Sequence, residues 1–279
     1  MKQRLTTLVW HELLLPLITL LISSPFCCTQ NTYYVTPTTD APCPAGEHCH
    51  ILSQYGEQYF QNLSSNTTLV FLSGEYALNS TIFFGTVDHY PPDYYHLHTS
   101  LTLVGTPSPS SSSSLPEVSS RIRCTWPAGV VFSGFSELHI NALGFISCGH
   151  HGSAAINIQS VRNVGISNCA FQNNTNIQSG LSKSGFGGAL RVCSSTLTLV
   201  RNNFRQNFAQ FGGAIQVGSH NTLTLSGNIL QENSADFGGA LFAERSNAIT
   251  LSDNAFLNNS ANNNKYEQHS QTLQEHICE

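Results

Sequence analysis

The sequence has few charged residues. Asp, Glu, Lys and Arg together make up 10% of its 279 residues, and the formal net charge is −5. After the first few positions, lysine occurs only at Lys183 and Lys265, and the arginines are scattered along the chain. Domains that bind nucleic acid gather Lys and Arg on one face. The composition therefore predicts no nucleic-acid partner, and no motif in the chain indicates a cofactor.

Long apolar runs are equally scarce. The one candidate, residues 13–22, follows Lys2 and Arg4 and contains Pro16. A membrane-spanning helix needs about 20 consecutive apolar residues, whereas a secretory signal combines basic residues, a shorter apolar stretch and small residues. We therefore interpret residues 1–29 as a signal peptide cleaved after Thr29, with an uncleaved membrane anchor as the alternative. The mature chain is expected to be secreted or at the cell surface, without a membrane span.

The predicted signal contains two of the nine cysteines. The others are Cys43, Cys49, Cys124, Cys148, Cys169, Cys193 and Cys278. In a secreted chain they favour disulfides over metal ligation. Cys43 and Cys49 enclose a short loop, and Cys124 and Cys148 lie about one repeat apart, so these four are the disulfide candidates. Cys169 and Cys193 are less favoured partners because a longer loop lies between them. An odd number leaves at least one thiol free or bonded to another chain.

The sequence also has no strong two-residue turn signal at each bend, as a stack of antiparallel hairpins would need. Instead, three copies that each begin Phe-Gly-Gly-Ala occupy residues 186–210, 211–236 and 237–262. A fixed period of this length indicates structural units that bury their apolar faces against one another. Alternation of apolar and polar residues predicts three strands in each copy. The expected inward side chains are Leu190/Val192, Ile215/Val217 and Leu241/Ala243; Leu197/Leu199, Leu223/Leu225 and Ile249/Leu251; and Phe204, Leu230 and Phe256.

Asparagines and glycines recur at the predicted bends. Two asparagine ladders are expected to pass amide hydrogen bonds from coil to coil. They are Asn202, Asn228 and Asn254, and Asn207, Asn233 and Asn259. The Gly-Gly doublets at 187–188, 212–213 and 238–239 are expected to supply positive φ or close backbone approach. Together these features favour a parallel β-helix.

The pattern N-x-F-x-x-N-x-A-x-x-x-G-G-A-[IL] resembles the GGA[IL]/FxxN repeat of the chlamydial polymorphic outer membrane proteins. It is also similar to secreted right-handed β-helix proteins of the pectate-lyase-like superfamily. The match is strong over residues 186–262 and weaker back to about Gly129. The resemblance implies an all-β, single-stranded right-handed parallel β-helix with three strands per coil and about six to seven coils. It implies extracellular display, and it does not select an activity, because that superfamily includes lyases, glycosidases and adhesins.

The remaining segments fit around this core. Residues 30–66 are expected to form an N-terminal cap that carries the cysteine loop, and residues 67–262 the β-helix. Val70/Leu72 and Ile82 are taken as inward residues of the first coil, and Leu101/Leu103 of the second. Residues 175–184 are expected to bulge out as a loop. Residues 263–279 form either a C-terminal cap or tail, or the end of a truncated gene model.

Candidate chemical groups are few. One segment contains four residues of metal-ligand type, His89, Asp93, His96 and His98. It also contains two prolines and no regular element that would orient these side chains, so a solvated loop is favoured. The adjacent pair His150 and His151 is interpreted as a solvated turn. Glycosylation candidates occur at five N-x-[ST] sequons. They are Asn62, Asn66, Asn79, Asn173 and Asn258, with Asn62 and Asn66 preferred because Asn258 adjoins a ladder position.

Two functions follow from these observations. Lyase or glycosidase chemistry needs acidic side chains at equivalent outward positions of neighbouring coils. The outward positions here are Asn157, Arg191, Gln216 and Phe242 in one strand, and His139, Gly165, Thr198, Thr224 and Thr250 in another. No two carboxylates stack at these positions. We therefore expect a non-catalytic scaffold or recognition surface for extracellular glycans or proteins, with a flat, uncharged lateral face. The alternative is a polysaccharide lyase or glycoside hydrolase whose site is built from loops at 90–98 and 175–184.

Overall fold

The computed structural model describes residues 31–38, 41–47, 49–52, 66–85, 100–107, 117–125, 128–149, 153–177 and 185–262. Its regular structure consists of β-strands, and every pair of named strands is parallel. Within these ranges, no helix has the length and apolar character required to traverse a bilayer. The predicted signal peptide and the segment 263–279 lie outside the described residues.

The strands form four sheets, which we call A, B, C and D. Sheet A contains, in spatial order, β2 (Cys49–Ile51), β1 (Asn31–Thr36), β3 (Thr67–Phe71), β6 (Ser100–Val104), β9 (Glu137–Asn141), β12 (Asn163–Ser167), β16 (Thr196–Val200), β20 (Thr222–Ser226) and β24 (Ala248–Ser252). Sheet B contains β4 (Gly74–Leu78), β7 (Ser120–Cys124), β10 (Leu143–Ile146), β13 (Ala170–Gln172), β17 (Asn203–Arg205), β21 (Ile229–Gln231) and β25 (Ala255–Leu257). Sheet C contains β5 (Ile82–Gly85), β8 (Val130–Ser133), β11 (Ile156–Gln159), β15 (Leu190–Cys193), β19 (Ile215–Val217) and β23 (Leu241–Ala243). Sheet D contains β14 (Thr175–Asn176), β18 (Phe208–Phe211), β22 (Ser234–Phe237) and β26 (Ser260–Ala261).

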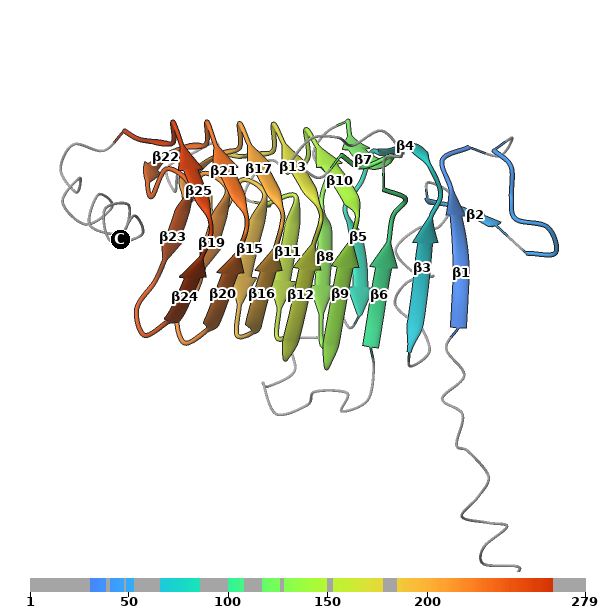
Figure 1. The fold of residues 1–279 in the computed structure, drawn as a ribbon, viewed down its shortest axis with the longest axis horizontal. Helices are drawn as coiled ribbons and strands as arrows, with labels where there is room; N and C mark the ends of the chain where they lie inside the picture. Colours follow the sequence, from blue (N-terminus) through green and yellow to red (C-terminus); the bar gives the residue numbers. More distant parts are fainter. Residues whose placement is uncertain are drawn as a thin grey trace, which may run out of the picture. The chain divides into compact units, whose positions relative to one another are not determined.

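The chain visits the sheets in a fixed cyclic order (Figure 1). From β3 to β11 the order is A, B, C, and from β12 onwards it is A, B, D, C. Sheet B holds seven strands, one for each passage of the chain. This arrangement is all-β and compatible with a parallel β-helix, and the number of passages lies within the expected range.

The expectation of three strands per coil is wrong for the later passages, which add a strand in sheet D. The inward residues of this fourth strand are small, Ala209 and Ala235, and both are fully buried. One buried alanine in a strand of four residues gives too weak an alternation to be recognised in the sequence. Thr175 and Asn176, expected within a bulging loop, form the first strand of this sheet.

The interior is a continuous column of aliphatic and aromatic side chains. Leu199, Leu225 and Leu251 occupy paired positions in successive strands of sheet A. On sheet B, Phe145, Phe171 and Phe204 stack with centroid distances of 5.3 and 4.7 Å. These phenylalanines are fully buried. Each passage therefore protects the apolar face of the next one, as the repeat predicts.

The first coil contains an error of one residue in the predicted register. Leu69 and Phe71 point into the core, with exposed fractions of 2% and 0%, whereas Val70 and Leu72 are only partly buried. Four consecutive apolar residues leave the alternation undefined there. The register is instead fixed by pairing, because Leu69 lies opposite Leu103. A shift of one residue exchanges the two faces of a strand.

Asparagine ladders hold the corners between sheets. In each ladder, the side-chain oxygen of one asparagine accepts hydrogen bonds from the backbone N–H and side-chain amide of the asparagine one passage earlier. Asn202, Asn228 and Asn254 form the ladder between sheets A and B, with donor–acceptor distances of 2.9 to 3.0 Å. Asn174, Asn207, Asn233 and Asn259 form the ladder between B and D, with distances of 2.9 to 3.1 Å. Asn221 and Asn247 form a shorter third ladder between C and A.

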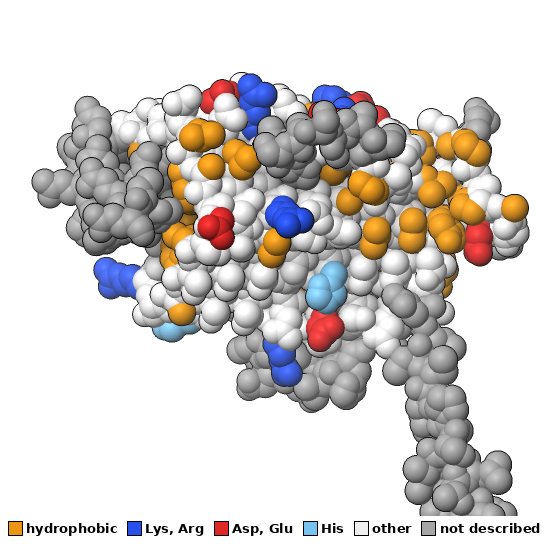
Figure 2. Space-filling model, in the orientation of Figure 1, with side chains coloured by type: hydrophobic (Ala, Val, Ile, Leu, Met, Phe, Trp, Pro, Cys, Tyr) orange, Lys and Arg blue, Asp and Glu red, His pale blue; other side chains and the backbone are white. Residues whose placement is uncertain are grey.

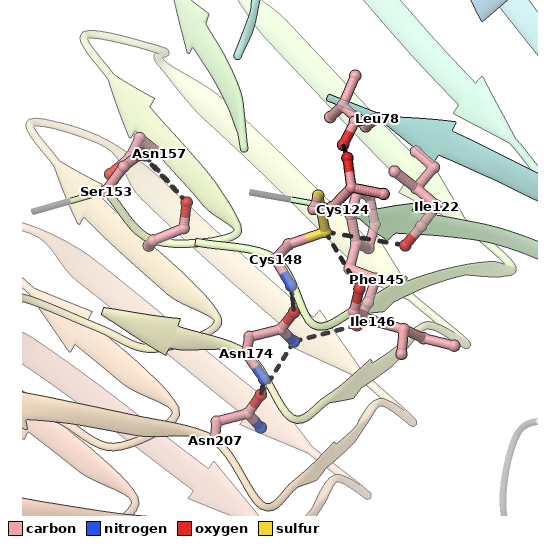
Figure 3. The surroundings of a disulfide bond; sticks show 12 residues. Leu78, Ile122, Cys124, Phe145, Ile146, Cys148, Ser153, Asn157, Asn174 and Asn207 are labelled. Carbon is pink, nitrogen blue, oxygen red and sulfur yellow. Dashed lines mark hydrogen bonds between the residues drawn. A yellow bond between two sulfur atoms is a disulfide. The ribbon is translucent and has the colours of Figure 1, made fainter. Parts of the chain in front are cut away.

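Cysteines replace asparagine at the first step of two ladders. Cys148 N–H donates to the Asn174 side chain and Cys169 N–H to the Asn202 side chain, both at 2.9 Å. Cys148 is also joined to Cys124 by a disulfide, and Figure 3 shows this bond next to the ladder. The other candidate pair, Cys43 and Cys49, forms a second disulfide. This disulfide links the first residue of β2 to the segment that precedes β2, within the region expected to cap the β-helix.

The two glycines of each doublet have different tasks. Gly187, Gly212 and Gly238 have φ values of 65°, 66° and 62°, which L-residues with a side chain rarely adopt. Gly213, the second glycine of its doublet, has no such constraint, but a Cβ there would overlap the carbonyl oxygen of Gly239 in the next passage. Positive φ and close approach are therefore both required, each at its own position.

Candidate functional site

The outward side chains of sheet A form a regular polar surface, which we call the hydroxyl face. They lie in two rows that run across β6, β9, β12, β16, β20 and β24. One row is Ser100, Glu137, Asn163, Thr196, Thr222 and Ala248, and the other is Thr102, His139, Gly165, Thr198, Thr224 and Thr250. Adjacent members of a row are about 4.8 Å apart, and the two rows are separated by roughly 6.6 Å, two residues along a strand. The result is a grid of side chains with fixed spacing.

The hydroxyl face is uncharged over most of its extent. Its charged or titratable members are Glu137 and His139, whose side chains lie 3.7 Å apart on β9. The threonine-rich part covers β16 and β20, and Thr196, Thr198 and Thr222 are exposed. Figure 2 shows that charged side chains on the visible surface are few and mostly isolated from one another. A surface of this kind offers hydrogen bonds to neutral polar groups without a strong field.

A shallow depression adjoins this face at the corner between sheets C and A. It has a volume of about 330 Å³ and is lined by Arg162, Ser194, Ser195, Thr196, His220 and Thr222. Ser195 is held in place because its N–H donates to the Asn221 side chain at 2.7 Å and its hydroxyl donates to the Cys193 carbonyl at 3.1 Å. The depression adds a guanidinium and an imidazole to one edge of the hydroxyl face.

The acidic residues within the described strands do not stack on one another. No acidic side chain lies opposite another in the described strand pairings. Glu75 forms an ion pair with Arg123 at 2.6 Å and Glu232 with Arg205 at 3.4 Å. Within the described ranges there is also no group of three or more His, Cys, Asp or Glu side chains placed to hold a metal ion.

The outward residues of sheet C are less accessible than the sequence suggested. Gln216 and Asn157 are only 1% and 5% exposed, although their strand positions face outwards. The guanidinium carbon of Arg191 lies 4.9 Å from the ring centroid of Phe186. The alternation of polar and apolar residues cannot reveal this burial, because the covering side chains belong to corners that follow or precede the strands. The Gln216 amide, for example, donates to Glu244, which follows β23.

The two described thiols outside the disulfides are not activated. Cys169 is fully buried, and burial raises its pKa to about 12. Burial also raises the pKa of the Cys193 thiol; Arg191 lowers it in part and Glu244 raises it further. A thiol acts as a nucleophile through its thiolate. Neither cysteine therefore has the character of a catalytic nucleophile.

The sequons differ in accessibility. Asn79, Asn173 and Asn258 are exposed, whereas Asn66 is half-buried and its side-chain oxygen accepts a hydrogen bond from Ser100 at 2.9 Å. The Asn258 side chain is exposed while its neighbour Asn259 belongs to the ladder. Asn62, the cluster from His89 to His98, and His150 and His151 lie outside the described residues.

Three features escaped the sequence interpretation. The third ladder, Asn221 and Asn247, was detectable from its spacing of 26 residues. The phenylalanines that open the repeats also form a stack, because Phe211 and Phe237 have nearly parallel rings 4.8 Å apart. No sequence signal indicated the contacts of Glu244, because the earlier repeats have no acidic residue at the equivalent position.

Comparison with family models, with curated proteins and with solved structures finds no match to this chain. The relationship to the polymorphic outer membrane proteins and to pectate-lyase-like proteins therefore stays a prediction. The geometry of the molecule itself is the basis for the functional argument that follows.

Proposed function

We propose that this protein is a right-handed parallel β-helix that acts outside the cell as a non-catalytic recognition scaffold, and that the hydroxyl face binds neutral glycans. The cyclic strand order supports the helix, and connections between parallel strands are right-handed in nearly all proteins. The two disulfides support an oxidising compartment. Secretion and the family resemblance are parts of the proposal.

The observation that carries the proposal is the grid of threonines on β16 and β20. Thr196 pairs with Thr222 and Thr198 with Thr224, so four hydroxyl-bearing side chains lie in register on one rigid surface. An extended glycan presents hydroxyl groups at regular intervals, and each can donate to or accept from a threonine. Because the grid is fixed by the backbone and the ladders, little ordering is needed on binding. For the enzyme alternative, the loop at 90–98 and most of the loop at 175–184 lie outside the described residues, and the described strands pair no acids.

A glycan array with the secreted protein tests the proposal directly. The double substitution of Thr198→Lys and Thr224→Lys places two bulky charges on the grid and should abolish binding of the array glycans that the hydroxyl face recognises. Ala77→Lys, an exposed outward position on sheet B, is the matched control and should leave binding unchanged. In parallel, polysaccharides are assayed for new reducing ends and unsaturated products. An array profile that the double substitution leaves unchanged, or any turnover, would contradict the proposal.

A further inference from the structure

A second site lies on the other side of the corner, over sheet C. A pocket of about 530 Å³ opens beside β23 and is lined by Ser219, Phe242, Ala243, Glu244 and Arg245. It is as shallow as the depression at the edge of the hydroxyl face, so it would contact one side of a ligand rather than enclose it. None of these residues belongs to the hydroxyl face. We propose that this pocket is an independent binding site for one neutral pyranose unit of a glycan.

The carboxylate of Glu244 is fixed in position by its neighbours. Gln216 donates its side-chain N–H to Oε1 at 3.1 Å, and Ser219 donates its hydroxyl to Oε2 at 2.9 Å. The backbone is held as well, because Glu244 N–H donates to the Val217 carbonyl at 2.9 Å. The Glu244 carbonyl also accepts a hydrogen bond from the Asn247 side chain at 2.9 Å. A carboxylate restrained on both oxygens is a preorganised acceptor.

Gln216, which donates to Glu244, is itself buried and has one unpartnered atom. Its side chain is 1% exposed, and its Oε1 atom has no hydrogen-bond donor. The orientation of the amide is required, because the opposite orientation would place an oxygen against the Glu244 carboxylate. A buried acceptor without a donor costs about 1–3 kcal/mol, so such atoms usually have a partner. Gln216 does not line the pocket, and its strand partner Arg191 carries a buried Nε without an acceptor, so Gln216 contributes to the site only by holding Glu244.

The remaining walls define the class of ligand. The Phe242 ring is tilted at 57° to Phe211, with centroids 5.2 Å apart, and this contact restrains the apolar wall of the pocket. Arg245 brings hydrogen-bond donors and balances the charge of Glu244. The charges of Glu244 and Arg245 sum to zero, so the pocket offers a charged ligand no net attraction. A neutral pyranose matches both requirements, since its C–H face packs on an aromatic ring and its hydroxyls donate to the carboxylate.

The test is calorimetric titration of the intact secreted protein with a panel of neutral hexasaccharides made of glucose, mannose, xylose or N-acetylglucosamine. Sulfated and uronate oligosaccharides serve as charged comparators. We expect at least one neutral member to bind. We expect Glu244→Gln and Phe242→Ala to weaken its affinity at least tenfold, which corresponds to about 1.4 kcal/mol. Glu232→Gln, which changes another carboxylate that accepts side-chain hydrogen bonds, should bind as the unaltered protein does.

The two sites are separated by the hydroxyl-face substitutions. Thr198→Lys with Thr224→Lys should leave the oligosaccharide affinity of the pocket unchanged, and Glu244→Gln should leave the array signals that depend on the threonines unchanged, so failure of one site is distinguishable from failure of the other. Equal affinity of Glu244→Gln and the unaltered protein, a preference for charged oligosaccharides, or no binding by any panel member would overturn the pocket proposal. Melting temperatures of all variants establish that a loss of binding is not a loss of folding.

Discussion

The asparagine ladder between sheets B and D gives the sharpest prediction about stability. Asn233 is fully buried, and its Oδ1 accepts hydrogen bonds from the backbone N–H and side-chain amide of Asn207 at 3.0 and 2.9 Å. Its own amide donates to the carbonyl of Phe204 at 3.0 Å and to the side chain of Asn259 at 2.9 Å. Asn233→Ala removes all four bonds at once.

The magnitude follows from these contacts. Asn207 lies between strands, so its buried N–H loses its acceptor, which costs about 1–3 kcal/mol. The other three bonds contribute roughly 0.5–1.5 kcal/mol each when both partners are neutral, and neighbouring groups recover part of this. We expect a loss of about 2 to 5 kcal/mol in the free energy of unfolding. That is a large share of the about 5–15 kcal/mol typical of a folded protein.

Equilibrium unfolding in urea, followed by circular dichroism, measures this loss. The matched control is Asn163→Ala, an exposed asparagine on β12 with no ladder contacts among its hydrogen bonds. Surface substitutions of this kind usually change stability by less than about 0.5 kcal/mol. If the two variants shift the urea midpoint equally, the ladder does not stabilise the corner, and the argument is wrong.

Asn233→Asp adds a pH dependence with a defined sign. The carboxylate still accepts the bonds from Asn207, but it faces the carbonyl oxygen of Phe204 and the Oδ1 of Asn259, which are both acceptors. It is also buried without a counter-charge. Both effects raise its folded-state pKa above the unfolded value of about 3.9. The ionisation penalty of this variant is therefore absent below the unfolded pKa and grows as the pH rises through the folded pKa, while the loss of one amide donor persists at every pH. A variant equally destabilised at pH 4 and pH 7 would contradict this account.

Three further outcomes are expected. Gly213→Ala should prevent folding because its Cβ would overlap the neighbouring backbone. Gly218→Ala should be tolerated because its Cβ would lie 3.4 Å from the nearest atom, and thermal melting curves of the two variants test the difference. Iodoacetamide at pH 8 should label native Cys193 more slowly than a free thiol and should leave Cys169 unlabelled until the protein unfolds. Peptide mapping measures the labelling, and rapid labelling of Cys169 would contradict its burial. Removing the Cys124–Cys148 disulfide, with its separation of 24 residues, should cost about 3 kcal/mol, and an unchanged melting temperature would contradict that.

The repeat made much of the fold predictable. Within residues 186–262 each inward position recurs three times, so the pairing of Leu199, Leu225 and Leu251 follows from alignment of the copies. Outside the repeat the same reasoning failed at Val70, because four adjacent apolar residues define no alternation. There the neighbouring strands determine the register, and a single strand carries no information about its partners.

The candidate sites were less predictable, for a physical reason. Thr198, Thr224 and Thr250 could be assigned outward positions because they follow the repeat. Gln216 and Glu244 do not repeat, and their contact connects a strand position with a corner 28 residues later. The burial of Gln216 depends on where the following passage places its corner. Sequence periodicity specifies strands and faces, while contacts between corners require the three-dimensional path of the chain.

The two kinds of position also have different freedom to change. Inward residues fill the core and ladder asparagines satisfy the corners, so a substitution at either disturbs the next passage. Exposed outward residues such as Thr198 contact mainly solvent, so they can vary without loss of the fold, whereas the buried outward residues Asn157 and Gln216 have less freedom. The threonine grid of sheet A and the Glu244 pocket of sheet C are both built from outward or corner side chains on an otherwise repeated framework. Recognition chemistry is therefore expected at the positions where the copies differ or face solvent, and the core residues that they share should affect binding only through stability.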